Sequence, residues 1–580
     1  MNIVGISAYS HESACCLLRD GELAAAAEEE RFTRIKRDAR MPTEAFRYCL
    51  EAARLDITDI DLLAYYETPR KKLERQLWST VPPGVDAEWL DAGRVERAIR
   101  ETLGYDGEVL YAEHHASHAA SAFFYSGFPD AAILTVDGVG EWATTSYGRG
   151  GPAGIEIFEE VRFPHSLGLF YSMITSFLGF RVNDGEYKVM GLAPYGEPTY
   201  VDELSRVLKS ASGAHYELDL TYFDFLRGTR MFSTAFVELI GVGPRKAGDD
   251  FASPYRNLAR SAQVVLEQML LDQVRYLRAR TGSPNLCMAG GVALNAVANG
   301  RIRREGPFAR LFIPPAPGDA GAALGAAAIA CFQRDRGVRL PLTDAALGPS
   351  HSHDDIRDVV AATGLPFEDH HEDERALLER VADAIAHGKI VGWFHGRMEF
   401  GPRALGSRSI LADPRDASIT DRLNRLVKRR ERFRPFAPSV LLGDAARHFT
   451  LDGPSPFMLD VCPVISPLTL PAITHVDGTA RPQTVDPFVQ PRFARLLQAF
   501  RARTGCPMLV NTSFNVADEP IVCSPVDAIL TMAISGLDLL VLEDWVLERG
   551  DAVESLARVV SEWGSTRAPR TINDVMYTFV

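Results

Sequence analysis

Two segments whose first residues lie 130 positions apart share one order of apolar runs and turns, and this repeat constrains the fold more than any other feature. The first copy comprises residues 3–7, 14–19 and 22–30, and the second comprises residues 133–137, 144–147 and 155–163. The dipeptide Asp20-Gly21 separates two runs of the first copy, as in a β-hairpin. Both copies end in Glu-Glu-x-Arg-Phe, at 28–32 and 159–163. We therefore predict an internal duplication of a strand-hairpin unit, with chance similarity of the short tail as the alternative.

Helices are expected between and after the two copies. Apolar residues recur at helical spacing in 42–54 and 254–280, and a helix of small residues is expected over 319–330. A duplicated strand-rich unit with helices between its parts resembles the superfamily of actin, the sugar kinases and the heat-shock chaperone ATPases, in which two α/β lobes close on a nucleotide. This resemblance implies an α/β domain of that kind over residues 1–345.

A second domain is expected after a linker. Residues 341–352 include proline, glycine, serine and histidine, a composition typical of a connecting segment. The apolar run 390–394 then predicts a buried strand. Because 580 residues exceed what one hydrophobic core usually holds, we predict a second α/β domain over residues 353–580.

The overall charge limits the classes of partner. The net charge is −14, with 46% hydrophobic and 24% charged residues, as in an ordinary globular protein. An acidic chain lacks the broad positive field that binds nucleic acid or an anionic membrane, so neither partner is expected. No signal peptide and no run of about 18 apolar residues is evident, and the eight cysteines are scattered, so we expect a cytoplasmic protein with reduced thiols. No obligate protein partner is inferred, and a homodimer is left open.

The stretch 396–409 combines three arginines with three glycines and two serines. Glycine lets backbone N–H groups come close to an oxyanion, and arginine binds phosphate or carboxylate through two parallel hydrogen bonds. From Arg397 to Arg434, eleven basic residues stand against five acidic ones. The pattern predicts a binding site for a small anion. A solvated basic helix over 421–432 is the alternative, but such a helix would not need the glycines.

His114 and His118 stand at positions i and i+4, so in a helix they lie on one face and suit two imidazole ligands of one divalent metal ion. Asp137 and Asp319 each follow a predicted strand and add two carboxylates. Two histidines and two aspartates suit Fe²⁺, Mn²⁺ or Zn²⁺. The alternative is a pair of core histidines without a metal.

Two glycine-containing turns and one histidine are weaker candidates. Gly290 and Gly291, with Asn295 nearby, lie at a strand-to-helix turn that could admit a phosphate or a ribose. His11 lies in the first turn of the chain, where an imidazole could take a proton from an alcohol. A lone histidine in a turn is, alternatively, exposed and without function.

Lysine is scarce, with 8 lysines among 62 basic residues. Three of the eight, Lys36, Lys188 and Lys428, lie within motifs, where an ammonium point charge differs from a guanidinium. Lys188 shares the polar, glycine-containing segment 184–196 with Glu186. We treat this segment as functional only because it adjoins the other motifs.

Taken together, these segments closely resemble the O-carbamoyltransferase family of nodulation-factor and antibiotic biosynthesis. The matching residues are 11–14, 28–32, 114–123, 137–141, 184–196, 290–295, 317–321, 396–409, 423–440, 475–485, 511–515 and 519–522. Each segment alone is unspecific, but the combination runs almost from end to end. One position departs from the family: the first turn has His11-Glu12 where the family has His-Asp, which leaves the role of His11 open.

The resemblance implies a two-step reaction with ATP, Mg²⁺ and carbamoyl phosphate. The second domain, similar to the YrdC-type proteins of tRNA threonylcarbamoylation, would form carbamoyl-adenylate, and the first would pass the carbamoyl group to a hydroxyl of a small natural product or sugar-like acceptor. By the family pattern, carbamoyl phosphate and ATP would be held by Arg403, Arg408, Lys428, Arg434, Arg481, Ser513 and Asn515, with Glu186, Lys188, Gly290, Gly291 and Asn295 in the first domain. An iron-type metal would be held by His114, His118, Asp137 and Asp319. The catalytic residues would be His11, as base on the acceptor hydroxyl, with Lys36 and Arg403.

Two other functions remain as alternatives. Both domains are similar to proteins of the threonylcarbamoyl pathway, in which the acceptor belongs to a tRNA, but an acidic chain without a basic stripe disfavours transfer to tRNA. A regulatory protein whose two lobes bind ATP without chemistry would give the four metal-ligand candidates no purpose. The acceptor is not readable from the sequence, and residues 66–78 and 216–236 are the segments expected to select it.

Overall fold

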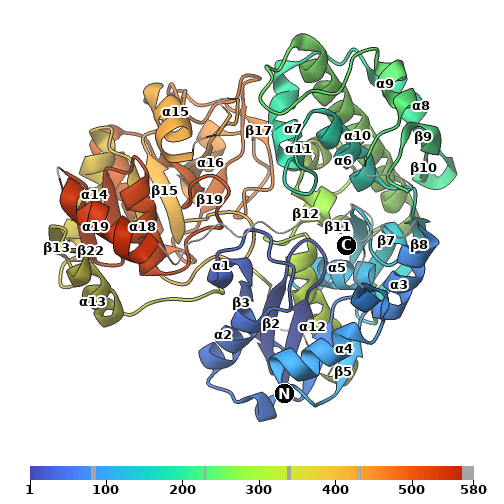
Figure 1. Cartoon of the computed structure of the whole chain (residues 1–580). Coiled ribbons are helices and arrows are strands. Elements are labelled where there is room, and N and C mark those ends of the chain that lie inside the picture. Colours follow the sequence, from blue (N-terminus) through green and yellow to red (C-terminus); the bar gives the residue numbers. More distant parts are fainter. Residues whose placement is uncertain are drawn as a thin grey trace. The chain divides into compact units, whose positions relative to one another are not determined.

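The computed structural model describes residues 1–79, 87–226, 230–335, 337, 341–428, 430–431, 433–550 and 552–564. The chain divides into two compact units (Figure 1). Among the described residues, the first unit comprises Met1–Glu29 and Asp38–Leu342, and the second comprises Glu30–Arg37 and the residues from Thr343 onward. Residues 227–229 of the expected acceptor segment, 429 and 432 of the basic segment and 565–580 of the predicted second domain lie outside the described residues.

The first unit contains two five-stranded sheets with the same topology, in the orders β3-β2-β1-β4-β5 and β12-β11-β6-β7-β8. Each sheet has an antiparallel meander of three strands, followed by two strands parallel to the first strand of that meander. The first sheet consists of β1 Asn2–Ser7, β2 Ala14–Arg19, β3 Glu22–Glu28, β4 Leu62–Tyr65 and β5 Val109–Tyr111. The second consists of β6 Ala131–Val136, β7 Ala143–Gly151, β8 Gly154–Arg162, β11 Asn285–Ala289 and β12 Arg310–Phe312. The predicted duplication is confirmed, and with it the α/β architecture of the actin and sugar-kinase type.

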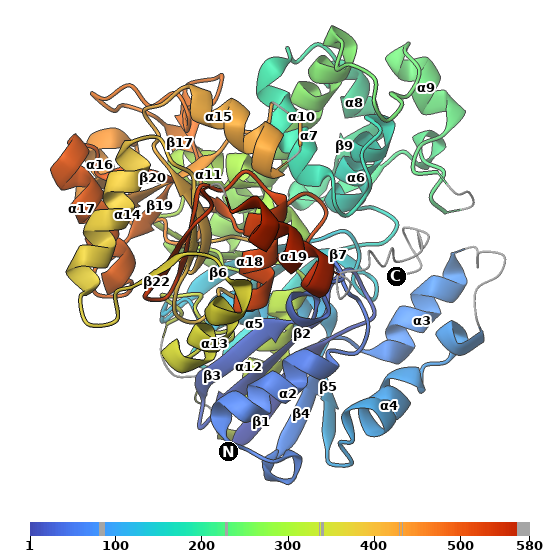
Figure 2. The ribbon, with the colours of Figure 1, turned by 60° about the vertical axis from the view of Figure 1, so that its left-hand side comes forward.

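Helices pack on the first sheet from opposite sides (Figures 1 and 2). Neighbouring side chains of a strand point to opposite faces. In β2 the Cys15 carbonyl accepts from Cys49 Sγ of helix α2 (Thr43–Ala53), whereas Cys16 Sγ donates to the Ala323 carbonyl of helix α12 (Asp319–Asp335). Helix α12 also packs closely on α5 (His114–Phe123). The two helices are so near that a Cβ atom at Gly325 would lie 1.7 Å from the Ser117 carbonyl oxygen. This close packing brings the first turns of α5 and α12 together.

Helix α5 packs on the second sheet, as does the long helix α10 (Ser253–Thr281). The predicted helices 42–54, 254–280 and 319–330 are confirmed as α2, α10 and α12. The remaining α-helices of the first unit are α3 Pro69–Trp78, α4 Arg94–Ala98, α6 Leu167–Phe177, α7 Glu186–Leu192, α8 Val201–Val207, α9 Thr234–Ile240 and α11 Ala296–Glu305. A two-stranded sheet of β9 (Leu208–Ser210) and β10 (Tyr216–Leu218) lies apart from the main sheets.

The second unit is built on one mixed sheet of eight strands in the order β13-β22-β21-β14-β15-β20-β16-β19. The strands are β13 Phe367–Asp369, β14 Val391–Phe394, β15 Arg408–Ala412, β16 Ala437–Leu441, β19 Gln483–Val485, β20 Met508–Ser513, β21 Leu539–Leu542 and β22 Trp545–Glu548, and a separate pair is formed by β17 Cys462–Pro463 and β18 Thr479–Ala480. The helices are α13 His353–Thr363, α14 Glu374–Ala386, α15 Ser418–Arg422, α16 Leu442–His448, α17 Pro491–Thr504, α18 Pro525–Ile534 and α19 Val553–Trp563. The strand predicted over 390–394 is β14, which is fully buried in the core of this unit.

The basic segment after residue 421 is only partly an α-helix. Helix α15 ends at Arg422 and continues as a π-helical turn, Leu423–Lys428. Leu423, Asn424, Val427 and Lys428 of this turn are buried. The alternative of a fully solvated basic helix is therefore wrong for the described part of the segment, because one side of the turn packs into the unit.

Residues 30–37 belong to the second unit although they follow the first hairpin in sequence. They begin with the short helix α1 (Glu30–Thr33). Arg31 donates to the Gly401 carbonyl at 2.9 Å, and Arg34 donates to the carbonyls of Ile521 at 2.6 Å and Pro520 at 2.8 Å. The two Glu-Glu-x-Arg-Phe tails consequently differ in structure, since β3 ends at Glu28 whereas β8 continues to Arg162.

Candidate functional site

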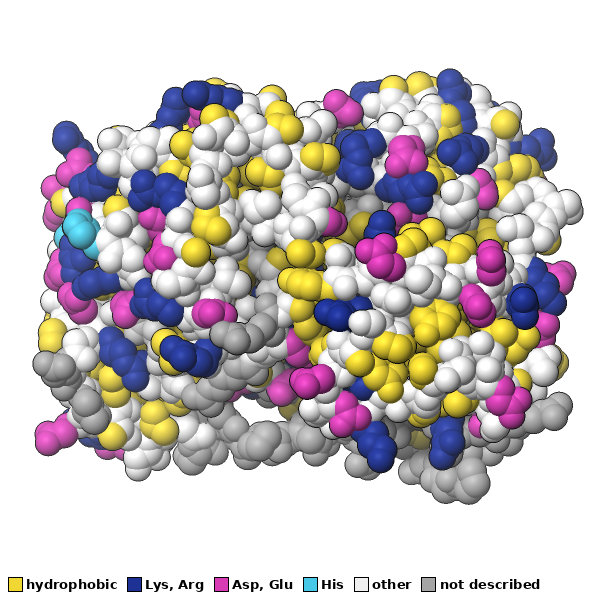
Figure 3. Space-filling view, turned by 90° about the horizontal axis from the view of Figure 1, so that it is seen from above, with side chains coloured by type: hydrophobic (Ala, Val, Ile, Leu, Met, Phe, Trp, Pro, Cys, Tyr) yellow, Lys and Arg dark blue, Asp and Glu magenta, His cyan; other side chains and the backbone are white. Residues whose placement is uncertain are grey.

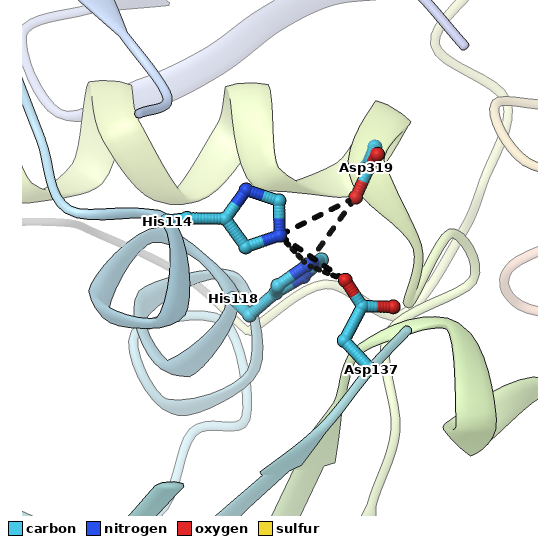
Figure 4. Close-up of side chains that lie close together, drawn as sticks. All are labelled: His114, His118, Asp137 and Asp319. Atoms are coloured by element: carbon cyan, nitrogen blue, oxygen red, sulfur yellow. Dashed lines mark hydrogen bonds and ion pairs between the residues drawn. The ribbon is translucent and has the colours of Figure 1, made fainter. Parts of the chain in front are cut away.

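The four predicted metal ligands come together in the first unit (Figure 4). His114 and His118 lie in the first two turns of α5, Asp137 directly follows β6, and Asp319 is the first residue of α12. All four residues are buried, and their ligating atoms lie within 4.8 Å of one another. The α5–α12 contact and the end of β6 thus place four side chains from three distant segments around one point.

The distances between these atoms fit one ion. The two Nε2 atoms of His114 and His118 are 3.0 Å apart, and Asp137 Oδ2 lies 3.1 and 3.5 Å from them. Asp319 Oδ1 lies 3.6 and 3.5 Å from the same two nitrogens. Ligands about 2.1 Å from an ion are separated by roughly 3.0 Å at a right angle and roughly 3.4 Å at the tetrahedral angle. Two imidazole nitrogens at 3.0 Å also cannot both direct a hydrogen at each other, so an ion or a shared proton is required between them.

The charges around this cluster are strongly coupled. Burial alone lowers the pKa of His114, but the carboxylates of Asp137, Glu67 and Asp319 raise it well above its usual value. Burial raises the pKa of Asp137, whereas its hydrogen bonds to the two histidines bring it well below the usual value. Because a metal ion binds deprotonated imidazole, it would have to displace the protons that these carboxylates favour, and metal affinity should fall as the pH drops.

Two glutamates that the sequence did not single out surround His114. Glu67 Oε2 faces His114 Nδ1 at 3.8 Å, and Lys72 donates to Glu67 Oε1 at 2.9 Å. Glu141 accepts hydrogen bonds from the backbone N–H groups of His114, at 3.1 Å, and Thr68, at 2.8 Å. Glu67 can orient the imidazole as a second carboxylate behind a ligand, and Glu141 satisfies the start of α5. Glu141 ends the family segment 137–141, and Glu67 lies in the segment 66–78 that was expected to select the acceptor, but neither was predicted to lie beside His114.

His11, Glu186 and Lys188 are placed by the same unit. His11 Nδ1 lies 3.0 Å from Asn183 Nδ2, which orients the ring, and His11 is within electrostatic range of Asp319. Glu186 Oε1 accepts from Ser172 at 2.9 Å and from the Asn183 backbone at 2.9 Å. Lys188 lies over the Phe180 ring. His11 is therefore near the four ligands, and the binding roles of Glu186 and Lys188 stay predictions.

The glycine turn after β11 has a clear structural reason. A Cβ atom at Gly290 (φ 93°) would lie 2.2 Å from the Val136 carbonyl oxygen, and the Gly291 N–H donates to Asp137 Oδ1 at 2.8 Å. Asn295 caps α11 and exchanges two hydrogen bonds with Gln263, each 3.0 Å long. These residues position Asp137 and the start of α11, and their binding of ATP stays a prediction.

In the second unit, three of the predicted anion-site residues lie together. Lys428 Nζ donates to the Ser513 carbonyl, to Ser513 Oγ at 3.1 Å and to Asn515 Oδ1 at 2.7 Å. Ser513 Oγ donates to Asn515 Oδ1 at 2.8 Å. The π-helical turn before residue 429 and the end of β20 supply these groups.

A group of positive charges surrounds them. Burial lowers the pKa of Lys428 well below its usual value, and Arg430, Arg434 and Lys36 lower it further. Burial likewise lowers the pKa of Arg481, and Arg403, Arg430 and Arg434 add to the effect. Arg430, Arg434 and Lys36 therefore lie within electrostatic range of Lys428, and Arg403, Arg430 and Arg434 lie within range of Arg481. We call these six residues the cation cluster, and one of them, Arg434, also pairs with Glu431 at 3.7 Å. Buried groups of like charge destabilise one another, so a cluster of them is typical of a site that binds an ion of opposite charge.

Two members of the cation cluster were not expected among the anion-binding residues. Arg430 was one of several basic residues in a run, and it is held by Asn424 Oδ1 at 2.8 Å and by the Phe436 ring. Lys36 was assigned only through the family resemblance, and it reaches the cluster because residues 30–37 belong to the second unit. A run of basic residues in a sequence does not show which of its members face inward.

The side chains of Arg397 and Arg408 in the glycine-arginine stretch are hydrogen-bonded to main-chain carbonyl oxygens. Arg408 is fully buried and donates to four carbonyl oxygens, of His395, Gly396, Ser407 and Pro349. Arg397 donates to the carbonyls of Leu347 and Gly348. Both side chains hold the main chain of the stretch in place, so a direct contact of Arg408 with phosphate stays a prediction.

A buried carboxylate shapes the same stretch. Glu399 Oε1 accepts from the backbone N–H groups of Leu405 at 2.7 Å, Ser407 at 2.7 Å and Arg408 at 3.2 Å. Glu399 is only 3% exposed, and its Oε2 has no hydrogen-bond partner among the described residues. Three N–H groups converging on one oxygen fix the curvature of residues 399–408 before any ligand binds.

Family models match most of the chain. A model described as carbamoyltransferase N-terminus matches residues 2–88 and 95–328, and one described as carbamoyltransferase C-terminus matches residues 382–549. The first match contains all four metal-ligand candidates, and the second contains the cation cluster apart from Lys36. None of the helices in the described residues is long and apolar enough to cross a membrane.

Three relatives illustrate the similarity. A protein of Synechocystis sp. described as uncharacterized protein sll1178 is 44% identical over 595 residues, covering 94% of this chain and 97% of that protein. Nodulation protein NolNO of Sinorhizobium fredii is 39% identical and covers 94% of this chain and 80% of its own length. The 3'-hydroxymethylcephem-O-carbamoyltransferase of Amycolatopsis lactamdurans is 36% identical over 47% of this chain and 50% of that protein.

Proposed function

The chain belongs to the carbamoyltransferase family and is an O-carbamoyltransferase, and from this premise we propose that it uses ATP to activate a carbamoyl group before passing it to a hydroxyl of a small molecule. In the first step, water releases carbamate and phosphate from carbamoyl phosphate. A carbamate oxygen then attacks the α-phosphorus of ATP, and pyrophosphate leaves with the bonding electrons. In the second step, the acceptor oxygen attacks the carbamoyl carbon, AMP leaves with the bonding electrons, and the hydroxyl proton passes to a base.

The cation cluster is the observation that carries this proposal. The other members of the cluster repel Lys428 or Arg481, and burial raises the free energy of these two groups in their charged forms. A triphosphate and an acyl phosphate together bring enough negative charge to offset that repulsion. Arginine and lysine groups already in place also stabilise charge that moves between phosphate oxygens during transfer, without reorganising at that moment. We therefore place formation of carbamoyl-adenylate in the second domain.

The four buried ligands of the first domain support the second step. Two imidazoles and two carboxylates fit a divalent ion, for which we propose Fe²⁺, with Mn²⁺ and Zn²⁺ as compatible alternatives. Such an ion would polarise and orient a phosphate-bearing group. His11, which is held by Asn183 and acts electrostatically on Asp319, is our candidate for the base that receives the hydroxyl proton.

The acceptor is proposed to be a small hydroxylated molecule. On the face drawn in Figure 3, basic and acidic side chains are interspersed. A mixed surface on a chain of net charge −14 favours a small acceptor over tRNA, whose binding needs a continuous basic field. The names of two relatives, a nodulation protein and a cephem carbamoyltransferase, suggest sugar-like or antibiotic acceptors. A cytoplasmic location fits the use of ATP.

Release of pyrophosphate tests the first step. Protein, ATP, Mg²⁺ and carbamoyl phosphate should release pyrophosphate, and omission of carbamoyl phosphate should abolish the release. Arg403→Ala should lose it, whereas Arg447→Ala, at an exposed position of α16, should keep it. Equal rates in both variants would contradict the assignment of the cation cluster.

A second variant separates the two steps. His114→Ala should lose the bound metal and carbamoyl transfer, yet retain pyrophosphate release, because the two sites lie in different units. The measurements are elemental analysis, pyrophosphate release and mass spectrometry of a panel of alcohols. A protein with full transfer activity but no metal would contradict the role of the four ligands.

A further inference from the structure

Two histidines and an aspartate meet at a second place, in the second unit and apart from the cation cluster. His353 is the first residue of α13, His371 lies between β13 and α14, and Asp544 lies in the turn between β21 and β22. One ligating atom from each lies within 4.8 Å of the others. The topology of the sheet brings them together, because β13 pairs with β22 and places the ends of both strands side by side.

The spacing of the three side chains approaches that of metal ligands. Asp544 Oδ2 lies 3.3 Å from His371 Nδ1 and 3.9 Å from His353 Nδ1. The two imidazole rings are 4.2 Å apart between centroids. His353 Nδ1 is buried and has no hydrogen-bond partner in the part of the chain that the structure describes. Ligands of one such ion are separated by roughly 3.0–3.4 Å, so the His371–Asp544 pair is already at that spacing and the His353–Asp544 pair is about half an ångström wider.

Neighbouring groups hold the three side chains in place. Asp369 Oδ2 faces His353 Nε2 at 3.7 Å, on the side of the ring opposite Nδ1. Arg492 pairs with Asp544 Oδ1, which leaves Oδ2 directed at the histidines. The Trp545 ring stacks on His353 at 4.7 Å, and its Nε1–H donates to the His353 carbonyl at 3.4 Å. A carboxylate behind a ligating imidazole and a fixed second carboxylate oxygen are typical surroundings of metal ligands.

We propose that His353, His371 and Asp544 form a site for a divalent transition ion of the zinc type. Imidazole nitrogen and carboxylate oxygen suit such an ion, and three protein ligands leave a position for water. The His371 side chain is 53% exposed, so the site is open to solvent. His353 and His371 lie outside the residues that the two family models match, and the site shares no residue with the four ligands of the first unit.

The ion would act on the anion-binding stretch through the residue next to Asp544. Glu543 accepts hydrogen bonds from His395 Nδ1 and from the Gly396 N–H, each 2.6 Å long, at the start of the glycine-arginine stretch. Arg492 joins Glu543 to Asp544, since it pairs with both carboxylates. An ion at Asp544 would tie the β21–β22 turn to α13 and so fix the position of Glu543. Binding of carbamoyl phosphate should therefore be tighter with the site filled.

Counting bound ions tests the site. The full-length protein is freed of metal with a chelator, equilibrated with Co²⁺ or Zn²⁺ and separated from unbound ions before elemental analysis. His371→Ala should bind one ion fewer per chain than the wild type and lose part of the visible Co²⁺ absorption. His370→Ala is the matched control, because its ring faces Glu368 and does not belong to the cluster.

The variants are interpretable because neither side chain is fully buried, His371 being 53% and His370 16% exposed, and thermal denaturation without metal should be unchanged in each. His371→Gln should repeat the loss of one ion. Equal ion counts in wild type and His371→Ala, or the same loss in His370→Ala, would overturn the proposal. Loss of an ion with unchanged affinity for carbamoyl phosphate would overturn its link to the anion-binding stretch.

Discussion

Glu399 offers the sharpest test of how the anion-binding stretch is shaped. Its single oxygen accepts three backbone N–H groups, from Leu405, Ser407 and Arg408. Glu399→Gln keeps the size of the side chain and one acceptor oxygen but removes the negative charge. A hydrogen bond to a charged group contributes about 1.5–3 kcal/mol, against about 0.5–1.5 kcal/mol between neutral groups. The loss is therefore about 1 kcal/mol per bond and about 3 kcal/mol for the three bonds.

Hydrogen exchange measures this loss directly, because local opening limits exchange of buried amides. Since about 1.4 kcal/mol corresponds to a factor of ten, the amides of Leu405, Ser407 and Arg408 should exchange about 100-fold faster in the variant. Peptides from the first unit should be unaffected. Glu379→Gln, which changes a 44% exposed carboxylate of α14, is the control and should leave the stretch as it is.

Exchange of residues 399–408 in Glu399→Gln within about threefold of the wild-type rate would refute this role of the carboxylate. Unchanged exchange would mean that Arg397 and Arg408, which also hold this main chain, suffice to fix it. If exchange rises as expected, the Michaelis constant for carbamoyl phosphate in pyrophosphate release should rise with it, because the backbone donors would no longer be held in place before binding.

Three further predictions concern charged groups. Glu67→Gln should weaken metal binding in the first unit by about 10–100-fold, measured by competition with a chelator, because the carboxylate behind His114 is lost; unchanged affinity would exclude a role for Glu67. Arg481→Gln should raise the melting temperature of the ligand-free second unit by about 2–4 °C, because one repelling cation is removed. The increase in melting temperature caused by added pyrophosphate should become smaller. A lower melting temperature without ligand would show that the cations of the cluster do not repel one another. Burial raises the pKa of Glu29 to about 7. The Glu29 carboxyl therefore binds a proton more strongly in the folded protein than in the unfolded chain, and the free energy of unfolding should fall by roughly 3 kcal/mol as the pH rises from about 4.5 to about 7. Glu29→Gln should flatten this part of the stability curve measured by denaturant unfolding, and an unchanged slope would contradict the shift.

Local patterns were enough to predict most of the fold and the grouping of the four metal-ligand candidates. The apolar runs around Asp20-Gly21 and the long repeat at 254–280 depend on neighbouring residues, and both have the expected structure. The histidine pair was readable because i and i+4 share a helix face. Asp137 and Asp319 could be added because residues at the ends of neighbouring strands and at the starts of the following helices come together in a duplicated α/β fold.

Features that depend on contacts between distant segments could not be read. Nothing in residues 30–37 shows that Arg34 donates to the carbonyl of Ile521, because a carbonyl acceptor leaves no trace in the sequence. The contacts of Arg408 could not be read from the sequence either. Its position among glycines is typical of an arginine that binds phosphate, but its N–H groups donate to four carbonyl oxygens. Glu399 was counted only as one of five acidic residues in a basic segment, and its three donors belong to a curved main chain that no periodicity reveals.

The path of residues 30–37 affects how this protein can be divided in the laboratory. A fragment cut from position 343 onward would lack Arg31, Arg34 and Lys36, three side chains that the second unit takes from residues 30–37. Supplying residues 30–37 as a synthetic peptide, or fusing them ahead of position 343, is therefore the rational way to obtain this half alone. In evolution, too, splitting the gene at the linker would separate these residues from the half to which they belong.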